Sequence, residues 1–151
     1  MISQEAVFDG LDRVFAGFTR IEKRLASLKP LWELFSKEFY REETAWFASE
    51  PWKPLSSAYA EQKRKRFGNK PLLRATDALF KSLTQEGSAG SIHRISDLGA
   101  QLGSSDFKAR LLAAGTSRMP ARDPLAEPEV ERYETIAGQY VAEMMSEAGF
   151  N

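Results

Sequence analysis

The chain has 151 residues, no cysteine, and 21 basic against 21 acidic side chains. This length, with 42% apolar residues, predicts one domain with one core. The lack of cysteine excludes disulfides, thiolate metal sites and cysteine catalysis, and it is typical of a reducing cytoplasm. No basic segment precedes an apolar run at the N-terminus, and no run of about 18 apolar residues occurs, so we expect neither secretion nor a membrane span.

The charges are unevenly distributed. From Lys53 to Arg74 there are seven basic residues and one acidic residue, a net charge of +6. From Asp123 to the end there are seven acidic residues and one basic residue, a net charge of −6. Either the two segments pack together within one subunit, or the basic face of one subunit meets the acidic face of the next in a head-to-tail ring.

Apolar residues recur at spacings of three and four near the N-terminus, which predicts an amphipathic helix from Gln4 to Leu28 with Ser3 as its N-cap. Pro30 interrupts this pattern, because proline is poorly tolerated inside a helix but fits the first turn of the next one. We therefore expect a second helix from Pro30 to about Ala48, folded back as an antiparallel hairpin; the alternative is one kinked helix. The apolar positions of the first helix are Val7, Leu11, Val14, Phe15, Phe18, Ile21, Leu25 and Leu28.

The second helix carries an aromatic stripe. Aromatic side chains at helical spacing are typical of a buried face, so we expect most of this stripe in the core and part of it buried only in an oligomer. The stripe consists of Trp32, Phe35, Phe39, Trp46 and Phe47.

A turn-rich link follows and holds Trp52, which we expect to be a partly buried plug over the core. Ser56 or Ser57 is placed to cap a helix that runs to about Phe67, and Gly68 can supply the left-handed residue that ends it.

The end of this helix is strongly basic. Its cations could face phosphate groups, with an aromatic ring among them to stack a base, or they could be solvated where cations favour the C-terminal dipole. No helix-turn-helix or zinc pattern accompanies the run, so we expect no sequence-specific DNA reading. The cations are Lys63, Arg64, Lys65, Arg66 and Lys70.

Short elements make up the middle of the chain. Thr76 is expected to cap a helix that reaches about Gln85. The segment from Gly90 to Ser105 has short apolar stretches around a Ser96-Asp97 turn, which predicts a β-hairpin. The only histidine, His93, lies there without a recognisable nucleophile or orienting group, so we expect an ordinary strand residue.

Two further helices are predicted. Asp106 can cap a short helix from Phe107 to Ala114. A final amphipathic helix opens at Pro128, ends at Gly149 and is expected to cover the small sheet. The fold class is therefore α+β with one small antiparallel sheet. The expected parts are a helical hairpin at 1–48, an α+β middle at 49–126, and a C-terminal helix at 128–148.

Between these two helices lies an arm, from Gly115 to Pro128, with the sequence GTSRMPARDPLAEP. Its three prolines fix backbone angles and donate no hydrogen bonds, so we expect a stiff, exposed segment. Part of it, from Met119 to Leu125, is expected to form an edge strand that could pair with another polypeptide.

Three blocks of the sequence resemble known phage proteins. GTSRMPAR, followed by Pro-Leu and another proline, resembles the signature of small head-tail joining proteins of tailed bacteriophages. PWKPLS at 51–56 and LLRATDALFKSL at 72–83 are similar to patterns of the Mu-like virion morphogenesis (tail completion) family. The blocks occur in the family's order over roughly two thirds of the chain.

The sequence also departs from the family pattern. Asp77 stands where the family usually has glycine, and Asp123 with Pro124 replaces the usual Pro-Phe. Phe107 lies near a family tyrosine, and Leu111 with Leu112 falls where a polar residue is common.

The resemblance implies a structural protein of the virion, assembled in the bacterial host cytoplasm and acting at the neck between head and tail. Such a subunit would form a six- or twelve-fold ring and contact the tail tube or terminator and the portal or adaptor. DNA would pass through the ring without sequence preference, and no membrane or cofactor is implied. The expected partner-contacting residues are Arg118, Met119, Pro120, Arg122, Leu125 and Trp52.

Motifs for catalysis are missing: the sequence has no Walker loop, GxGxxG, HExxH, EF-hand or GxSxG pattern. The carboxylate pairs Glu42-Glu43 and Glu129 with Glu131 are expected to be solvated on helix faces. We therefore expect a non-enzymatic protein. The alternative to the neck protein is a small DNA-associated accessory protein that uses the basic residues at 63–70.

Overall fold

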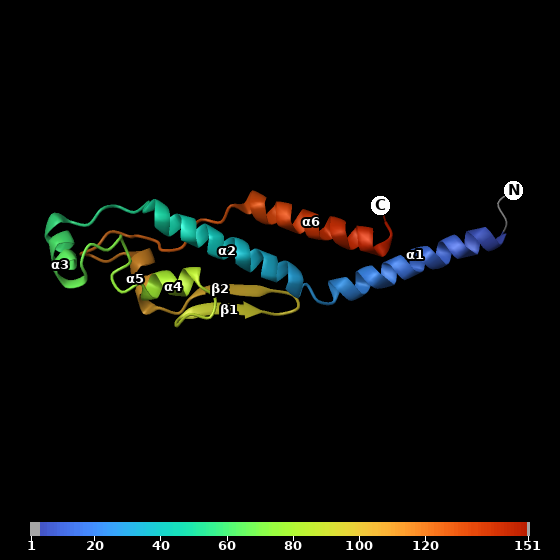
Figure 1. Cartoon of the computed structure of the whole chain (residues 1–151), viewed down its shortest axis with the longest axis horizontal. Helices are drawn as coiled ribbons and strands as arrows, with labels where there is room; N and C mark the ends of the chain where they lie inside the picture. Colours follow the sequence, from blue (N-terminus) through green and yellow to red (C-terminus); the bar gives the residue numbers. More distant parts are fainter. Residues whose placement is uncertain (1–3, 151) are drawn as a thin grey trace. The chain divides into compact units, whose positions relative to one another are not determined.

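The computed structural model describes residues 4–150, with side chains from Gly10 onward. Six helices and one two-stranded antiparallel sheet are found in this part, an α+β fold as predicted (Figure 1). The predicted Ser3 cap lies outside the described residues. In chain order the elements are α1 (Gln4–Leu25), α2 (Lys29–Ser49), α3 (Ser57–Phe67), α4 (Ala78–Thr84), β1 (Ser91–Ile95), β2 (Ala100–Ser104), α5 (Phe107–Ala114) and α6 (Val130–Ala148).

The chain forms two compact units. Unit 1 contains residues up to Phe35, the hairpin tip Ile95–Ala100 and the segment from Glu129 onward. Unit 2 contains Ser36–Arg94 and Gln101–Pro128.

In unit 1, α1 packs against α6. The ring of Phe18 lies 5.3 Å from that of Phe150, and the guanidinium of Arg24 lies 5.3 Å from the centre of the Tyr140 ring. The same guanidinium forms an ion pair with Glu147. Because Phe18 meets Phe150 while the later residue Arg24 meets the earlier residue Tyr140, the two helices run antiparallel.

This arrangement corrects one packing prediction. The sequence predicts that the first two helices form a hairpin, but the helix that α1 contacts extensively is α6. The reason is the buried stripe Tyr140, Met144 and Ala148, which at spacings of four matches a helical partner. Within unit 1, α6 also contacts the start of α2, where the rings of Tyr133 and Phe35 lie 5.1 Å apart; the predicted packing of the C-terminal helix on the sheet stays a prediction.

Unit 2 holds the enclosed core. Phe47, Leu79 and Leu83 are buried together, and the half-buried rings of Phe39 and Trp52 pack around them. The predicted burial of the aromatic stripe of α2 is thus confirmed for Phe47, and the predicted role of Trp52 as a plug over the core is confirmed.

Local chemistry explains most element ends. The Ser56 hydroxyl accepts a hydrogen bond from the backbone N–H of Tyr59 at the start of α3. At the start of α5, the Asp106 carboxylate accepts a hydrogen bond from the backbone N–H of Lys108. Thr76 does not cap α4: its N-cap is Asp77, which makes no side-chain cap bond. None of the described helices is long and apolar enough to cross a membrane.

Candidate partner-binding groove

A groove of about 500 Å³ opens in unit 2 between α3, α5 and the arm. Most of its lining is apolar, and the charged lining residues are all basic. The apolar members are Leu55, Tyr59, Leu73, Ala75, Leu79, Leu112, Met119 and Pro120; the basic ones are Lys63, Lys108, Arg118 and Arg122; Ser56 and Thr76 complete the lining.

The arm enters this groove through a tight turn. Helix α5 ends at Gly115, whose φ of 72° is the left-handed conformation that glycine favours. A Cβ atom there would lie 2.8 Å from the backbone nitrogen of Ala121, so no side chain fits. Thr116 and Met119 then pair through two backbone hydrogen bonds of 2.8 and 3.2 Å. The turn leaves Arg118 exposed and Met119 half-buried.

The predicted edge strand is wrong. Beyond the single bridge between Thr116 and Met119, residues 120–128 form no strand. Backbone N–H groups of the arm are bonded within the chain: Arg122 donates to the carbonyl of Leu112, and Leu125 donates to the carboxylate of Asp123. The arm of the single chain therefore presents no edge strand to which a partner could add.

The expected role of Arg122 as a contact between subunits also needs correction. Its side chain is buried, 5% exposed, and its Nε and Nη2 atoms donate to the carbonyl oxygens of Lys53 and Pro54 at 2.7 and 2.9 Å. A planar guanidinium can bond two neighbouring carbonyls at once, and here it fixes the arm to the chain's own 51–56 segment.

Two indoles strengthen the same attachment. The Nε1 atoms of Trp46 and Trp52 both donate to the carbonyl oxygen of Asp123, at 3.3 and 2.5 Å. Their rings meet edge to face, with centres 6.1 Å apart. Trp52 is thus engaged within its own chain, while the side chain of Leu125 remains 43% exposed.

The carboxylate pair Glu42-Glu43 on α2 was predicted to be solvated, but both side chains are buried. Glu42 and Glu43 are 7% and 2% exposed. The Oε1 atom of Glu43 accepts a 3.0 Å hydrogen bond from the backbone N–H of Ala126, so this buried side chain holds the far end of the arm. Burial raises the pKa of Glu43 to about 7, although the Ala126 bond opposes this effect and the neighbouring Glu42 adds to it. Glu42 lies three residues after Phe39 and four residues before Trp46, so helical spacing places it on the same face as the aromatic stripe. This spacing was the sequence signal that Glu42 is buried.

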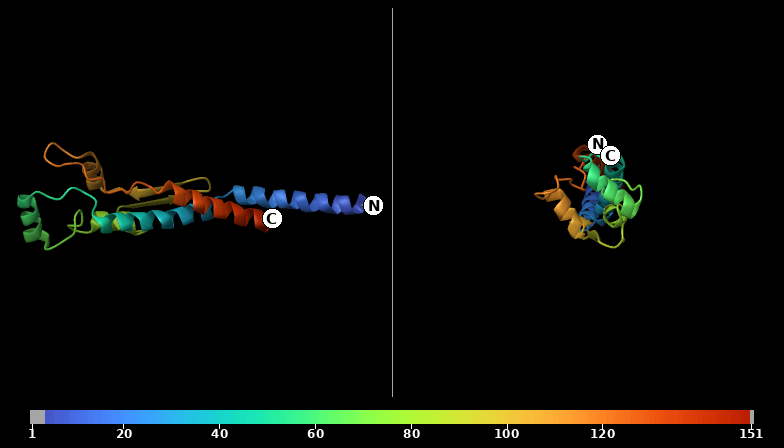
Figure 2. Two further views of the ribbon diagram at one scale, coloured as in Figure 1. Left: turned by 90° about the horizontal axis from the view of Figure 1, so that it is seen from above. Right: turned by 90° about the vertical axis from the view of Figure 1, so that its left-hand side faces the viewer.

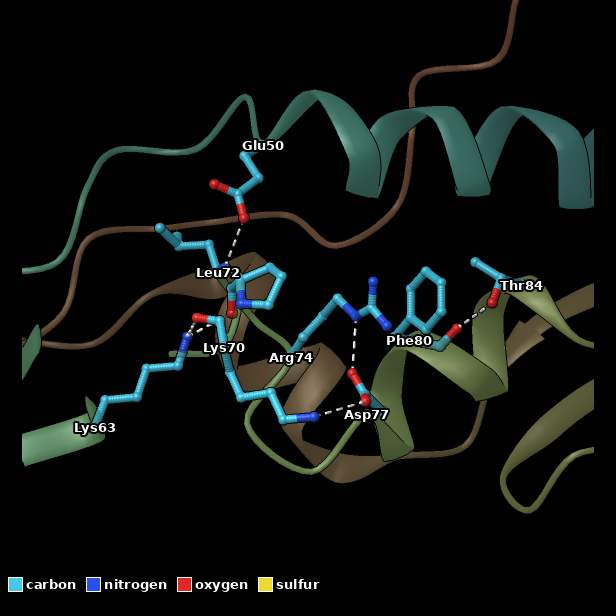
Figure 3. A network of polar contacts seen from close by, with 9 residues as sticks. Glu50, Lys63, Lys70, Leu72, Arg74, Asp77, Phe80 and Thr84 are labelled. Atoms are coloured by element: carbon cyan, nitrogen blue, oxygen red, sulfur yellow. Dashed lines mark hydrogen bonds and ion pairs between the residues drawn. The ribbon is translucent and has the colours of Figure 1, made fainter. Parts of the chain in front are cut away.

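The loop before α4 is held in an unusual backbone conformation. Leu73 and Asp77 have φ values of 56° and 58°, a region that side chains other than glycine rarely adopt. The Asp77 carboxylate accepts a 2.8 Å hydrogen bond from Arg74 and pairs with Lys70 at 3.5 Å (Figure 3). The Arg74 bond lowers the pKa of Asp77. Arg74 in turn lies 3.7 Å over the ring of Phe80.

The basic run at 63–70 divides into two groups. The Lys63 ammonium donates to the carbonyls of Lys70 and Pro71, and burial lowers its pKa, while Lys70 pairs with Asp77 (Figure 3). These two cations are directed at their own chain. Arg64, Lys65 and Arg66 are exposed, with Lys65 2.9 Å from Glu61, so a phosphate-facing role stays a prediction for them.

His93 is a hydrogen-bonded strand residue. Its Nδ1 atom lies 3.0 Å from the hydroxyl of Tyr40, and the two rings stack. Burial raises the pKa of that Tyr40 hydroxyl. Among the described residues, no group of three or more histidine and acidic side chains is placed to hold a metal ion.

Nine of the fourteen groove residues were not predicted as site residues, among them Leu55, Tyr59, Leu112 and Lys108. Leu55, Tyr59 and Leu112 belong to apolar or helical patterns that do not tell a groove from a core, and Lys108 carries no local signal. Their side chains meet only because α3 and α5 fold against the arm. The resulting surface suits a partner that inserts an apolar side chain and places a carboxylate against the basic residues.

Comparisons of the chain with protein-family models, with curated proteins and with solved structures find no match.

Proposed function

We propose that this protein is a structural subunit of the head-tail neck of a tailed phage, a tail completion or connector protein that assembles into a ring by protein contacts. The groove of unit 2 is then a docking site for a neighbouring neck component. The protein acts without catalysis, as a component of the virion.

One observation carries the proposal. The three sequence blocks that resemble the phage families, at 51–56, 72–83 and from 115 onward, meet at the same groove. They supply ten of its fourteen lining residues. The Arg122 bonds to Lys53 and Pro54 also join the first block to the third. Segments of structural importance to a common site are expected to share a recognisable pattern although they lie far apart in sequence.

A departure from the family pattern gives further support. Asp77 stands at a position where the resembling family has glycine, and its φ is 58°. Glycine adopts this conformation at no steric cost, and aspartate is among the few other residues that tolerate it. The backbone shape that a glycine pattern implies is therefore compatible with this chain.

The arm favours docking because it is already ordered. Pro120 restricts the backbone, and Arg122, Glu43 and the two indoles attach the arm on both sides of the exposed Leu125. A preformed surface loses less conformational entropy on binding. Arg118 and Met119 remain accessible at its turn.

Binding to purified tail-tube and portal proteins tests the proposal. We expect Arg118→Glu to weaken binding to one of them by about tenfold or more, because a carboxylate replaces a groove cation. The matched control is Arg94→Glu, a charge reversal at an exposed strand residue that does not line the groove. Equal losses for both variants, or no binding by the native protein, would contradict the proposal. So would DNA binding by the native protein that weakens steeply with salt and depends on Arg64 to Arg66.

A further inference from the structure

Helix α1 exposes a long apolar stripe. Leu11, Phe15, Phe18 and Leu25 are 46%, 65%, 57% and 48% exposed. Their spacings of four, three and seven place them on one face of the helix. At 1.5 Å per residue, the stripe extends over roughly 20 Å. A contiguous apolar face of this kind on a folded protein marks an interaction site.

The partner helix α6 does not cover this stripe. Its end meets α1 at Gly17 and Phe18, where the ring of Phe150 packs. Figures 1 and 2 show α1 continuing past the end of α6, and all residues from Gly10 to Ala16 are exposed. The described stretch of α1 from Gly10 to Ala16 is therefore not covered by α6.

The spacing of the apolar residues indicates what covers them. Leu11, Phe18 and Leu25 are seven residues apart, and Val14 and Ile21 fall between them at alternating steps of three and four. An unbroken repeat of this type is the seam of a coiled coil, which requires another helix of similar length.

The charges of α1 specify the orientation of that helix. By sequence, residues 4–15 contain three acidic residues and Arg13, a net charge of −2. Residues 16–25 contain three basic residues and Glu22, a net charge of +2. Two parallel copies would place like charges together, whereas two antiparallel copies place each acidic half against a basic half. Arg24 is engaged by Glu147 of its own chain, which leaves Arg20 and Lys23 as the exposed cations.

We propose that α1 pairs antiparallel with α1 of a second copy, so that the isolated protein is a two-fold symmetric dimer. The exposed stretch of each α1 from Gly10 to Ala16 then lies beside the half of its partner's α1 that carries α6. A two-fold contact is self-complementary, since the same stripe serves both copies. This interface goes beyond the neck proposal and does not depend on it, because its residues belong to unit 1 and the groove residues belong to unit 2.

Cysteine cross-linking tests the orientation, since the native chain has no cysteine. In the antiparallel pair that sets each acidic half against a basic half, Leu11 packs against Ile21 of the second copy, and Val14 packs against Phe18. A mixture of the variants Leu11→Cys and Ile21→Cys should therefore form a disulfide between them, while neither variant alone should cross-link. Cα atoms more than about 7 Å apart cannot be bridged, which makes the pattern selective. Self-cross-linking of Leu11→Cys alone would overturn the antiparallel arrangement, because Leu11 faces itself only in a parallel pair.

Mass measurement in solution tests the dimer itself. The native protein should have twice the mass of one chain at micromolar concentration, and Phe15→Glu should weaken the dimer by about tenfold or more. The matched control is Val141→Glu on α6, where the native side chain is 48% exposed; it should leave the dimer intact. A monomeric native protein, a ring mass in isolation, or equal losses for the two variants would overturn the inference. The groove proposal is tested separately by Arg118→Glu, so the two can fail independently.

Discussion

Unit 2 surrounds Phe47, Leu79 and Leu83 with side chains of its own, and buried polar contacts attach its arm to α2 and to the 51–56 segment. Unit 1 has fewer residues, yet ten of the fourteen large apolar side chains described as exposed belong to it. The two units therefore bury apolar surface in different ways. Unit 2 encloses its own core, and unit 1 presents surface that a second molecule can cover.

This difference separates folding from assembly. Substitutions in the enclosed part of unit 2 are expected to change the stability of the single chain, and substitutions on the stripe of α1 are expected to change association. The following experiments compare matched pairs of variants, beginning with the largest expected effect.

The first pair is Leu83→Ala and Phe15→Ala. Leu83 is fully buried, so its truncation leaves a cavity and should lower the free energy of unfolding by about 3 kcal/mol. Phe15 is 65% exposed, so its truncation should cost the monomer under about 0.5 kcal/mol. Urea unfolding followed by tryptophan fluorescence at low protein concentration measures both. Similar losses for the two variants would mean that α1 belongs to a closed core.

The second experiment replaces the buried Glu43 by glutamine. Its pKa is raised from an ordinary value of 4.5 to about 7 in the folded protein, so the folded state holds a proton that the unfolded state releases between these pH values. Stability should therefore fall by about 3 kcal/mol as pH rises from 4.5 to 7 and change little from this group above pH 7. Glutamine keeps an oxygen to accept the Ala126 bond and carries no charge.

Unfolding measured from pH 4 to 8 should show Glu43→Gln as the more stable protein at pH 8 and a flatter profile between pH 4.5 and 7. The control is Glu127→Gln, which changes an exposed carboxylate on the same arm segment. If Glu43→Gln loses stability at pH 8, the negative charge itself contributes to holding the arm, contrary to this account.

Local elements of both units could be predicted from sequence because their signals are local. Ser56 as a cap, Gly68, Gly115 and Gly149 as helix ends, and the hairpin turn at Ser96 follow from the chemistry of a few adjacent residues. The packing partner of α1 could not be predicted this way. Its apolar repeat fits α2, α6 or another molecule equally well, and long-range geometry decides among them.

The candidate site could be predicted only in part. Arg118, Met119 and Pro120 were expected in a partner surface, and all three line the groove. Arg122 was assigned to the same surface because it lies in the same short motif, but it is directed at the carbonyls of Lys53 and Pro54. Sequence spacing does not reveal on which side of an irregular segment a side chain lies, since such a segment has no fixed period.

The third pair, Arg122→Ala and Arg118→Ala, separates the two arginines of the arm. Removing Arg122 leaves two buried carbonyl oxygens without their charged donor, which should lower the free energy of unfolding by about 2 kcal/mol. Arg118 is exposed, so its truncation should cost under about 0.5 kcal/mol and act on partner binding instead. Thermal unfolding and binding to neck components are measured on the same preparations. A larger stability loss for Arg118→Ala would reverse the roles assigned here.

The smallest expected effect concerns the contact that unit 1 does form. Gly17 and Gly10 both lie inside α1, where replacing glycine by alanine favours the helix by up to about 1 kcal/mol. A Cβ atom at Gly17 would lie 2.8 Å from the carbonyl oxygen of Ala148 and 2.7 Å from the ring of Phe150, whereas one at Gly10 meets nothing within 4 Å.

The helix preference is common to both variants, so the difference between them isolates the crowding against α6. Gly17→Ala should be less stable than Gly10→Ala by about 1 kcal/mol. Thermal melts followed by circular dichroism, with amide hydrogen exchange of α1 as the local readout, measure the difference. Equal melts and equal exchange would show that α1 and α6 do not pack in solution, and that α1 is available to a partner along its whole length.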